Sequence, residues 1–224
     1  FQGKMPKNII NMPRMDNSGF EEANDYLELC DKIGSFISQA SQGAIKELEI
    51  VYSGEIADLS TQELFTRTII KGLLTPIINE GVSAVNARNI AKSRGLNITE
   101  AKTDKNESYN SLVKLTAKTD KSEFSVVGTY LHEPRIIEIN GYRVDVKPEG
   151  DMFIANYKDI PGSIGSIGTK LGEYNVNVGI MQVGRDIPGG KAIMILTLDN
   201  EAPKEAIEEI KSLGNVDDAT TLKL

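Results

Sequence analysis

Residues 158–185 read KDIPGSIGSIGTKLGEYNVNVGIMQVGR, and this stretch decides how the last third of the chain folds. Pro161 and Gly162 stand where a helix typically begins. Apolar residues then recur at the spacing of one helical face: Ile164, Ile167 and Leu171. The stretch therefore predicts a turn, a helix over 162–174 and a strand over 177–185.

The sequence on either side completes a βαββαβ order. A strand pattern at 152–158 precedes the quoted stretch, and the patterns of a strand, a helix and a strand follow it at 191–199, 203–213 and 216–223. This order is the ferredoxin-like arrangement, an antiparallel sheet with two helices on one face. We therefore expect a small domain over residues 151–224.

The glycines of the quoted stretch leave three interpretations open: a nucleotide loop, close helix packing, or the mouth of a small-ligand pocket. A dinucleotide loop needs G-x-G-x-x-G and a later acidic residue, whereas Gly162 and Gly165 start a G-x-x-G-x-x-G run. On a helix, Gly165, Gly168 and Gly172 share one side. They predict a close approach of this helix to a sheet or to another subunit.

The turn before this helix has the chemistry to hold an α-amino acid. Free backbone N–H groups at a helix start favour a carboxylate, and Asp159 can bind an ammonium group. Tyr157 flanks the turn, and Asn177 begins the next strand. The alternative is that Asp159 only caps the helix and that Asn177 only forms a turn.

The first two thirds of the chain mix strands and helices. Residues 46–150 contain a strand, helical patterns and two hairpins, the second of which turns on Asn140-Gly141. Before them, residues 17–42 predict an amphipathic helix whose apolar stripe needs a partner from a neighbouring chain or a missing domain. Residues 1–4 read as the remnant of a cleavable tag.

Composition narrows the classes of function. The 224 residues carry 25 Lys and Arg against 32 Asp and Glu, a net charge of −7, which disfavours an extended nucleic-acid surface. No apolar run is long enough to span a membrane. Cys30 is the single cysteine, which excludes an internal disulfide and a cysteine-based metal cluster and fits a cytoplasmic protein. His132, the single histidine, sits at a hairpin end, and we expect no catalytic or metal site.

Several motifs resemble one enzyme family. Asp159-Ile-Pro-Gly-Ser-Ile-Gly with Asn175-Val-Asn-Val resembles the ACT domain, an amino-acid-sensing module, and MQVGRDIPGGKAIMILTLD is similar to the ACT domain of D-3-phosphoglycerate dehydrogenases. KGLLTPIINEGVSAVNARNIAKSRGL and EPRIIEINGYRVDVKPEG resemble the intervening, allosteric substrate-binding (ASB) domain of the longer form. NMPRMD and YLELCDKIGSF resemble the last segment of its catalytic half.

The resemblance implies an α+β chain with four parts: the tag remnant at 1–4, a terminal segment and helix of the catalytic half at 5–45, a mixed α/β ASB domain at 46–150 and a ferredoxin-like ACT domain at 151–224. Such a chain is the regulatory and oligomerisation part of a serine-biosynthesis enzyme. The missing half would use NAD to oxidise 3-phosphoglycerate to 3-phosphohydroxypyruvate. We therefore expect no catalytic residue, no cofactor and no dehydrogenase activity from this chain alone.

The resemblance also implies two regulatory sites. The feedback inhibitor L-serine would contact the following ACT residues: Tyr157, Asp159, Ile160, Gly162 and Asn177. Asn177 would act across the seam of a homodimer formed by ACT domains, within a tetrameric parent. A phosphate or phosphorylated substrate would contact basic residues of the ASB region: Arg135, Arg143, Lys147 and Arg185. Thr197 stands where the family has a further basic residue, and a merely solvated basic hairpin is the alternative.

Two other functions stay open. A stand-alone ACT protein could sense an amino acid on behalf of a different protein. Iron–sulfur L-serine dehydratases use a similar pair of domains, but they depend on cysteines and on a Ser/His-rich motif that this chain lacks. The helix at 17–42 distinguishes a stand-alone sensor from a truncated dehydrogenase. A stand-alone sensor needs a partner to cover this helix, whereas in a truncated dehydrogenase it is a severed interdomain helix.

Overall fold

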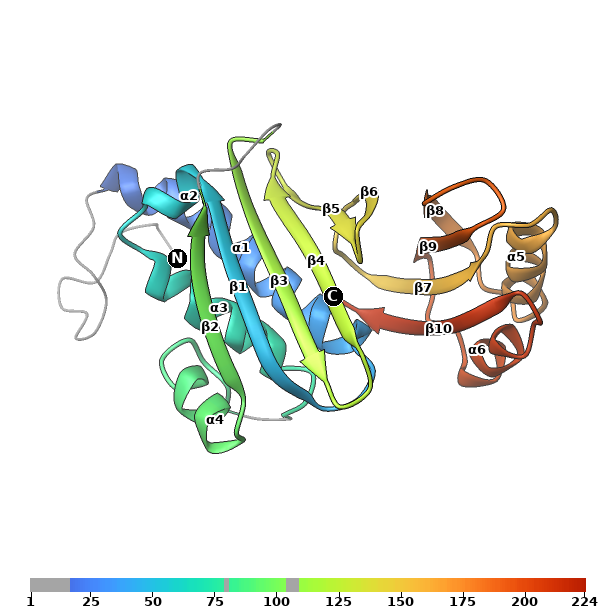
Figure 1. Ribbon diagram of the computed structural model, residues 1–224, viewed down its shortest axis with the longest axis horizontal. Helices are drawn as coiled ribbons and strands as arrows, with labels where there is room; N and C mark the ends of the chain where they lie inside the picture. The colour runs from blue at the N-terminus through green and yellow to red at the C-terminus, as the bar shows by residue number, and fades with distance from the viewer. Residues whose placement is uncertain (1–16, 79–80, 104–108) are drawn as a thin grey trace.

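The computed structural model describes residues 17–78, 81–103 and 109–224, with side chains from residue 24 onward, and these residues form two domains (Figure 1). The N-terminal domain contains α1 (Asn17–Ala40), β1 (Ile45–Gly54), α2 (Glu55–Asp58), α3 (Gln62–Leu74), α4 (Ala87–Ser93), β2 (Asn97–Thr103), β3 (Ser111–Thr119), β4 (Glu123–Tyr130), β5 (Pro134–Ile139) and β6 (Tyr142–Val146). The C-terminal domain contains β7 (Asp151–Lys158), α5 (Ser163–Glu173), β8 (Val178–Arg185), β9 (Lys191–Leu198), α6 (Lys204–Lys211) and β10 (Val216–Lys223). The predicted tag remnant and the segment up to residue 16 lie outside the described residues.

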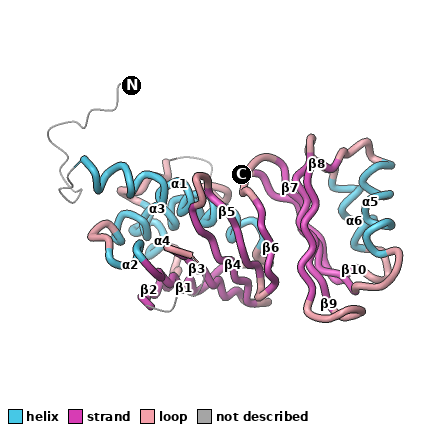
Figure 2. The backbone as a smooth tube through the Cα atoms, turned by 90° about the horizontal axis from the view of Figure 1, so that it is seen from above, coloured by secondary structure: helices cyan, strands magenta, loops and turns pink. Residues whose placement is uncertain are grey.

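The C-terminal domain has the predicted βαββαβ order. Its four strands lie in the order β10-β7-β9-β8, and every neighbouring pair is antiparallel. Figure 2 shows α5 and α6 together on one face of this sheet. The ferredoxin-like prediction is confirmed, because the turn and periodicity signals of this region are local and agree with one another.

The N-terminal domain is built on a six-stranded mixed sheet. Its strands lie in the order β2-β1-β3-β4-β5-β6, with β1 and β2 parallel and the other pairs antiparallel. The hairpin predicted at Asn140-Gly141 joins β5 to β6, and both residues have positive φ, 50° and 83°. No helix among the described residues is long and apolar enough to cross a membrane.

Helix α1 is covered by its own domain. Its apolar stripe is fully buried against α3 and the sheet, through Leu29, Cys30, Ile33, Phe36 and Ile37. Burying each large apolar side chain contributes roughly 1.5–3 kcal/mol. The prediction that this stripe needs a neighbouring chain or a missing domain is therefore wrong for the described part of the helix.

Two glycines allow α1 and α3 to touch. A Cβ at Gly34 would collide with the carbonyl oxygen of Ile69, and one at Gly72 would collide with the carbonyl oxygen of Asp31. The side chain of Lys71 also donates to the Asp31 carboxylate at 2.8 Å. At this crossing the two glycines allow a close approach of the two helix backbones.

The glycines of α5 behave differently. Apart from the neighbouring residues and backbone of α5 itself, no described atom lies within 4 Å of the position that a Cβ would take at Gly165, Gly168 or Gly172. The prediction that they pack against a sheet is wrong within this chain. Their side of α5 is open, which leaves the other predicted partner, a second subunit, untested.

The two domains pack against each other, with one face of the C-terminal sheet against the edge strand β6 and helix α1. The helix-free face of the C-terminal sheet adds five side chains to the core of the N-terminal domain: Met152, Ile154, Ile193, Ile195 and Leu222. Figure 2 shows this sheet standing between its own helices and the N-terminal domain. A Cβ at Gly184 would lie 2.8 Å from the Cβ of Tyr142, so β6 and β8 touch at a glycine.

Gln39 ties α1 to the last strand of the C-terminal domain. Its Nε2 donates to the carbonyl oxygen of Lys223 at 2.9 Å, and the Lys223 N–H donates to Gln39 Oε1 at 3.0 Å. Gly150 and Leu224 exchange two backbone hydrogen bonds, both 3.0 Å long, which extend the pairing of β7 with β10 as far as Leu224. The packed surfaces and the Gln39 hydrogen bonds hold the two domains in one frame.

Candidate functional site

Hydrogen bonds to neighbouring residues fix the loop between β7 and α5, residues 159–162. The Asp159 N–H donates to the carbonyl oxygen of Gly190 at 2.8 Å. The buried Ser163 hydroxyl donates to the carbonyl oxygen of Lys158 and accepts from Asn215 Nδ2, both at 2.8 Å. Sequence reasoning missed these supports, although a serine directly after Pro-Gly is a recognisable signal at a helix start.

Gly162 gives the loop its shape. Its φ of 94° is in the left-handed region, where a residue with a Cβ is strained, and it caps the N-terminus of α5. Ile160 is 47% exposed on the same loop. The loop therefore presents the start of α5, with its positive dipole end, at the surface.

Tyr157 lies beneath the loop with an unpaired hydroxyl. The residue is fully buried at the end of β7, and its hydroxyl has no hydrogen-bond partner among the described residues. Burial raises the pKa of Tyr157, the Asp159 carboxylate raises this pKa further, and the Arg185 guanidinium opposes the shift. A buried hydroxyl without a partner is unfavourable, so a ligand that reached Tyr157 would form a hydrogen bond that the chain alone leaves unmade.

Asp159 and Arg185 form an ion pair at this loop. Arg185 Nη1 lies 3.0 Å from Asp159 Oδ2, with the two side chains 56% and 21% exposed. The register Tyr157–Ala192–Arg185 across β7, β9 and β8 explains why they meet. Arg185, which was predicted as part of the anion site in the N-terminal domain, lies instead beside the predicted serine residues.

Asn177 is at the opposite end of the sheet from Asp159. It precedes Val178, which is level with Asp151 at the start of β7 because both pair with Leu198. An eight-residue strand spans roughly 25 Å, so Asn177 cannot reach the Asp159 end of its own chain. Within the chain, its Nδ2 donates to the Asp199 carboxylate at 2.6 Å.

Two of the predicted anion-binding residues form a cluster that carboxylates already fill. Arg135 contacts Asp145 at 2.6 Å and Glu133 at 3.0 Å, and Lys147 contacts Glu133 at 3.1 Å and Glu149 at 2.8 Å. We call these five residues the Glu133 cluster. A hydrogen bond from Lys147, followed by one from Arg135, lowers the pKa of Glu133. Three carboxylates surround two cations, so the cluster has no net positive charge to offer an anion.

The remaining predicted anion-binding residues are not part of this cluster. Arg143 is exposed on β6, and its carbonyl oxygen lies 3.1 Å from the position of a Cβ at Gly184. Thr197 pairs with Met152 and Ile180 in the C-terminal sheet, where its side chain supplies no charge. The structure thus brings Arg135 and Lys147 together and places Arg185 at another site.

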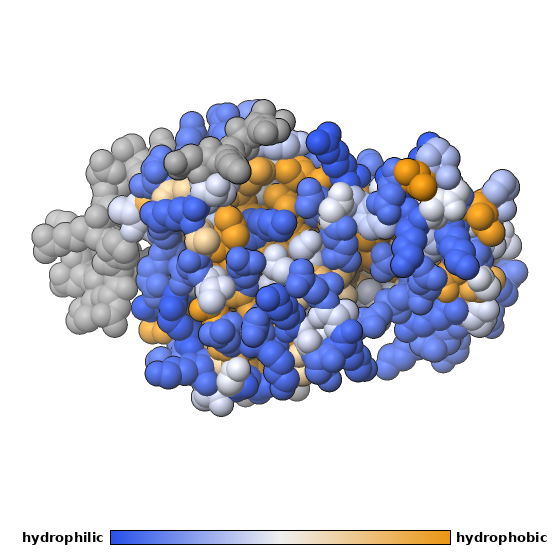
Figure 3. All heavy atoms as spheres, viewed as in Figure 1, coloured by the Kyte–Doolittle hydropathy of each residue, from blue (hydrophilic) through white to orange (hydrophobic). Residues whose placement is uncertain are grey.

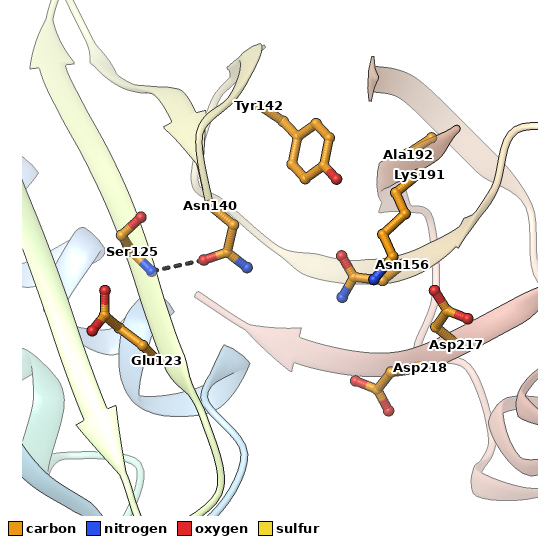
Figure 4. Close-up of a pocket in the computed structure, with 9 residues that line it drawn as sticks. All are labelled: Glu123, Ser125, Asn140, Tyr142, Asn156, Lys191, Ala192, Asp217 and Asp218. Atoms are coloured by element: carbon orange, nitrogen blue, oxygen red, sulfur yellow. Dashed lines mark hydrogen bonds between the residues drawn. The ribbon is translucent and has the colours of Figure 1, made fainter. Parts of the chain in front are cut away.

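A cleft of about 540 Å³ lies between the two domains (Figure 4). Its N-terminal-domain side carries Glu123, Ser125, Asn140 and Tyr142, and its C-terminal-domain side carries Asn156, Lys191, Ala192, Asp217 and Asp218. The Ser125 N–H donates to Asn140 Oδ1 at 2.8 Å. With three carboxylates and one ammonium group, the cleft does not suit a phosphate. Within the described ranges, no group of three side chains could hold a metal ion.

Several apolar side chains are exposed on the C-terminal domain, which carries the 159–162 loop. They are Ile160, Ile164, Ile180, Met181 and Ile187. Figure 3 shows apolar spots at the end that carries β8 and α5. In the described part of the chain β8 pairs only with β9, so it is an edge strand with a free row of backbone groups.

Comparisons with known proteins agree with this architecture. The family model described as the D-3-phosphoglycerate dehydrogenase intervening domain matches residues 22–140, and the model described as the ACT domain matches residues 153–215. The first match begins inside α1, in agreement with the packing of that helix in the N-terminal domain.

Three similar curated proteins carry the name D-3-phosphoglycerate dehydrogenase. The D-3-phosphoglycerate dehydrogenase of Methanocaldococcus jannaschii is 39% identical over 224 residues, covering 100% of this chain and 42% of that protein. Those of Archaeoglobus fulgidus and Bacillus subtilis are each 35% identical, covering 100% and 96% of this chain and 43% and 41% of their own lengths. The chain therefore spans less than half of each relative and matches their C-terminal region.

Proposed function

The chain belongs to the D-3-phosphoglycerate dehydrogenase intervening-domain family and carries an ACT domain, and from this premise we propose that it regulates such an enzyme. In this proposal the parent oxidises 3-phosphoglycerate with NAD in the cytoplasm, as part of serine biosynthesis. The catalytic and NAD-binding part would lie in the portion of the relatives that this chain does not span. We keep the proposed domain boundary near residue 150 and extend the intervening domain to include α1.

We propose that L-serine binds at the 159–162 loop of the C-terminal domain. The observation that carries this proposal is the buried Tyr157 hydroxyl, which lacks a partner beside a carboxylate and a helix N-terminus. The helix start and the hydroxyl can donate to a carboxylate, and Asp159 can accept from an ammonium group. Ile160 and Gly162 supply the walls and the shape of this half-site.

The other half-site would come from a second copy. An isologous antiparallel pairing of two β8 edges places the start of one β8 beside the end of the other. Asn177 of the partner subunit would then lie beside the Asp159–Arg185 ion pair. Within a single chain, roughly 25 Å separates Asn177 from that ion pair. The exposed apolar residues Ile180 and Met181 on β8 and the open glycine side of α5 support a homodimer through this surface.

Serine would then act by stabilising one arrangement of the assembly. Coupling between two such sites is typically worth about 1–3 kcal/mol. Because the two domains share a core, they would move as one body relative to the rest of a tetrameric parent. The anion site of the N-terminal domain has less support, since Arg135 and Lys147 already bind carboxylates.

A stand-alone amino-acid sensor remains the second candidate. The burial of α1 in its own domain removes the reason for expecting that such a sensor needs another protein to cover this helix. The site at the 159–162 loop would be the same in either case. The two candidates differ in one testable respect. If the chain regulates a dehydrogenase, serine should change the activity of an enzyme that contains both this chain and the catalytic part found in its relatives.

Isothermal titration of the chain with L-serine, D-serine and glycine tests the serine site. We expect L-serine to bind at one site per chain, D-serine and glycine to bind at least tenfold more weakly, and sedimentation to report a dimer. Asn177→Ala should abolish binding in a folded dimer. Equal binding of the two serine enantiomers, or none by a dimeric wild-type chain, would refute the proposed site.

A further inference from the structure

Arg185 stands at the 159–162 loop with most of its donors available. It ends β8, and the strand register places it level with the buried Tyr157. Among the described residues, its side chain donates from Nη1 to the Asp159 carboxylate at 3.0 Å. A guanidinium group has five N–H donors, and this side chain is 56% exposed. Arg185 can therefore donate hydrogen bonds to a second carboxylate beside the 159–162 loop.

We propose that Arg185 recognises the carboxylate of the bound amino acid, and that the amino acid inserts into the Asp159–Arg185 ion pair. This inference rests on the proposed function and deepens it. The ligand ammonium group replaces the guanidinium at Asp159, and the ligand carboxylate replaces Asp159 at Arg185. The Tyr157 hydroxyl, which has no described partner, donates to the same carboxylate.

Charge balance explains why a zwitterion fits this site. One internal ion pair becomes two intermolecular ion pairs, so every charge keeps a partner while the seam loses water. A ligand with only an ammonium group separates Asp159 from Arg185 and leaves the arginine uncompensated. A ligand with only a carboxylate leaves Asp159 uncompensated. The resting ion pair therefore makes the site selective for molecules that carry both charges.

The pKa of the Tyr157 hydroxyl responds to both Asp159 and Arg185, which agrees with the three side chains lying close together. This pKa is raised by burial and by Asp159 and is lowered by Arg185, so it senses both members of the ion pair. The Asp159–Arg185 pair is partly exposed, and such pairs contribute little to stability. Opening it for a ligand is therefore only weakly opposed.

The test compares L-serine with L-serinamide, which keeps the ammonium group but has a neutral amide in place of the carboxylate. Wild-type protein should bind L-serine at least tenfold more tightly than L-serinamide in a calorimetric titration. Arg185→Gln should weaken L-serine binding at least tenfold without weakening L-serinamide binding, which no longer has to break the ion pair, so that the discrimination disappears. Arg185→Lys, which keeps the charge but not the planar fork, should restore part of it.

Arg143→Gln is the matched control, because it removes the same charge from an exposed strand residue next to Gly184 and should leave the discrimination intact. Sedimentation of each variant confirms that it remains folded and assembled as the wild type is. Arg185→Gln protein that still prefers L-serine by the wild-type factor would overturn the inference while leaving the serine site in place. A wild-type chain that binds no serine would refute the proposed function, and this inference with it.

Discussion

The Asp159–Arg185 ion pair at the 159–162 loop and the Glu133 cluster contain the same kinds of side chain, but they differ in how fully these side chains are paired. In the Glu133 cluster, Arg135 and Lys147 each contact two carboxylates, and Glu133 bridges them. At the loop, one ion pair lies beside a buried hydroxyl that lacks a described partner.

This difference is what we expect between a structural cluster and the proposed binding site. Charged groups that already satisfy one another gain little from a ligand, because the ligand must displace an existing partner for each bond that it makes. A buried donor without a partner gains a full hydrogen bond when a ligand arrives. Family resemblance marks both regions, and pairing distinguishes them.

The largest expected effect is on serine binding at the loop. Asp159→Ala removes the proposed acceptor for the ammonium group, and a hydrogen bond to a charged group contributes about 1.5–3 kcal/mol. Titration should show serine affinity falling by about 10- to 100-fold. Arg135→Ala, which breaks the ion pairs of the Glu133 cluster instead, should leave serine affinity unchanged, and an equal loss in both variants would contradict the comparison.

The next effect concerns the frame that holds both regions. Gln39→Ala removes two hydrogen bonds to the backbone of Lys223, and the unfolding free energy should fall by about 1–2 kcal/mol. Chemical denaturation measures this loss, with the exposed Gln42→Ala as control. Unchanged stability would mean that α1 and β10 do not hold the two domains together.

A smaller effect of opposite sign is expected at Tyr157. Tyr157→Phe removes a buried hydroxyl that has no described partner, so the unliganded protein should gain up to about 1 kcal/mol of stability. Serine affinity should fall about three- to tenfold, since the ligand loses one neutral donor. A variant that is destabilised without serine would show that the hydroxyl already has a partner, and the contrast with the Glu133 cluster would disappear.

The smallest effect is in the Glu133 cluster and depends on pH. Because Lys147 lowers the pKa of Glu133 in the folded state, the carboxylate contributes stability above its ordinary pKa of 4.5, and this is lost as the pH falls through the lowered value. Glu133→Gln should slightly lower the melting temperature at pH 7 and converge with the wild type at the acid end.

The same variant sharpens the comparison in a second way. Glu133→Gln leaves Arg135 and Lys147 with one carboxylate fewer, so inorganic phosphate should bind it more tightly than it binds the wild type. Calorimetric titration with phosphate measures this gain. Strong phosphate binding by the wild-type chain would show that the cluster is an anion site despite its carboxylates.

Local signals explain what the sequence could predict. The strands and helices of residues 151–224 follow from periodicity and turn residues that are close in sequence, and their predicted bounds agree with the structure to within one or two residues. The Asn140-Gly141 hairpin was predictable because its two positive φ angles require particular residues. Family motifs pointed correctly to the two kinds of domain.

Contacts between distant residues explain what it could not. The partner of α1 depends on Gly34 meeting the Ile69 carbonyl, which no periodicity in either helix reveals. Arg185 meets Asp159 because β9 sets their register, 26 residues apart in sequence. The carboxylates of the Glu133 cluster meet Arg135 and Lys147 only in the folded β5–β6 hairpin, so the sequence alone does not show that they are paired.

The most direct measurement of the central claim is a mixing experiment between two inactive variants. At a serine concentration that fills only wild-type sites, Asp159→Ala and Asn177→Ala chains should each show no measurable binding, because every seam site needs Asp159 from one chain and Asn177 from the other. Mixed and allowed to exchange subunits, they should regain about one site per four chains, since about half of the dimers would be mixed and each would have one intact site. A mixture that shows subunit exchange but no serine binding would contradict a site shared between two copies.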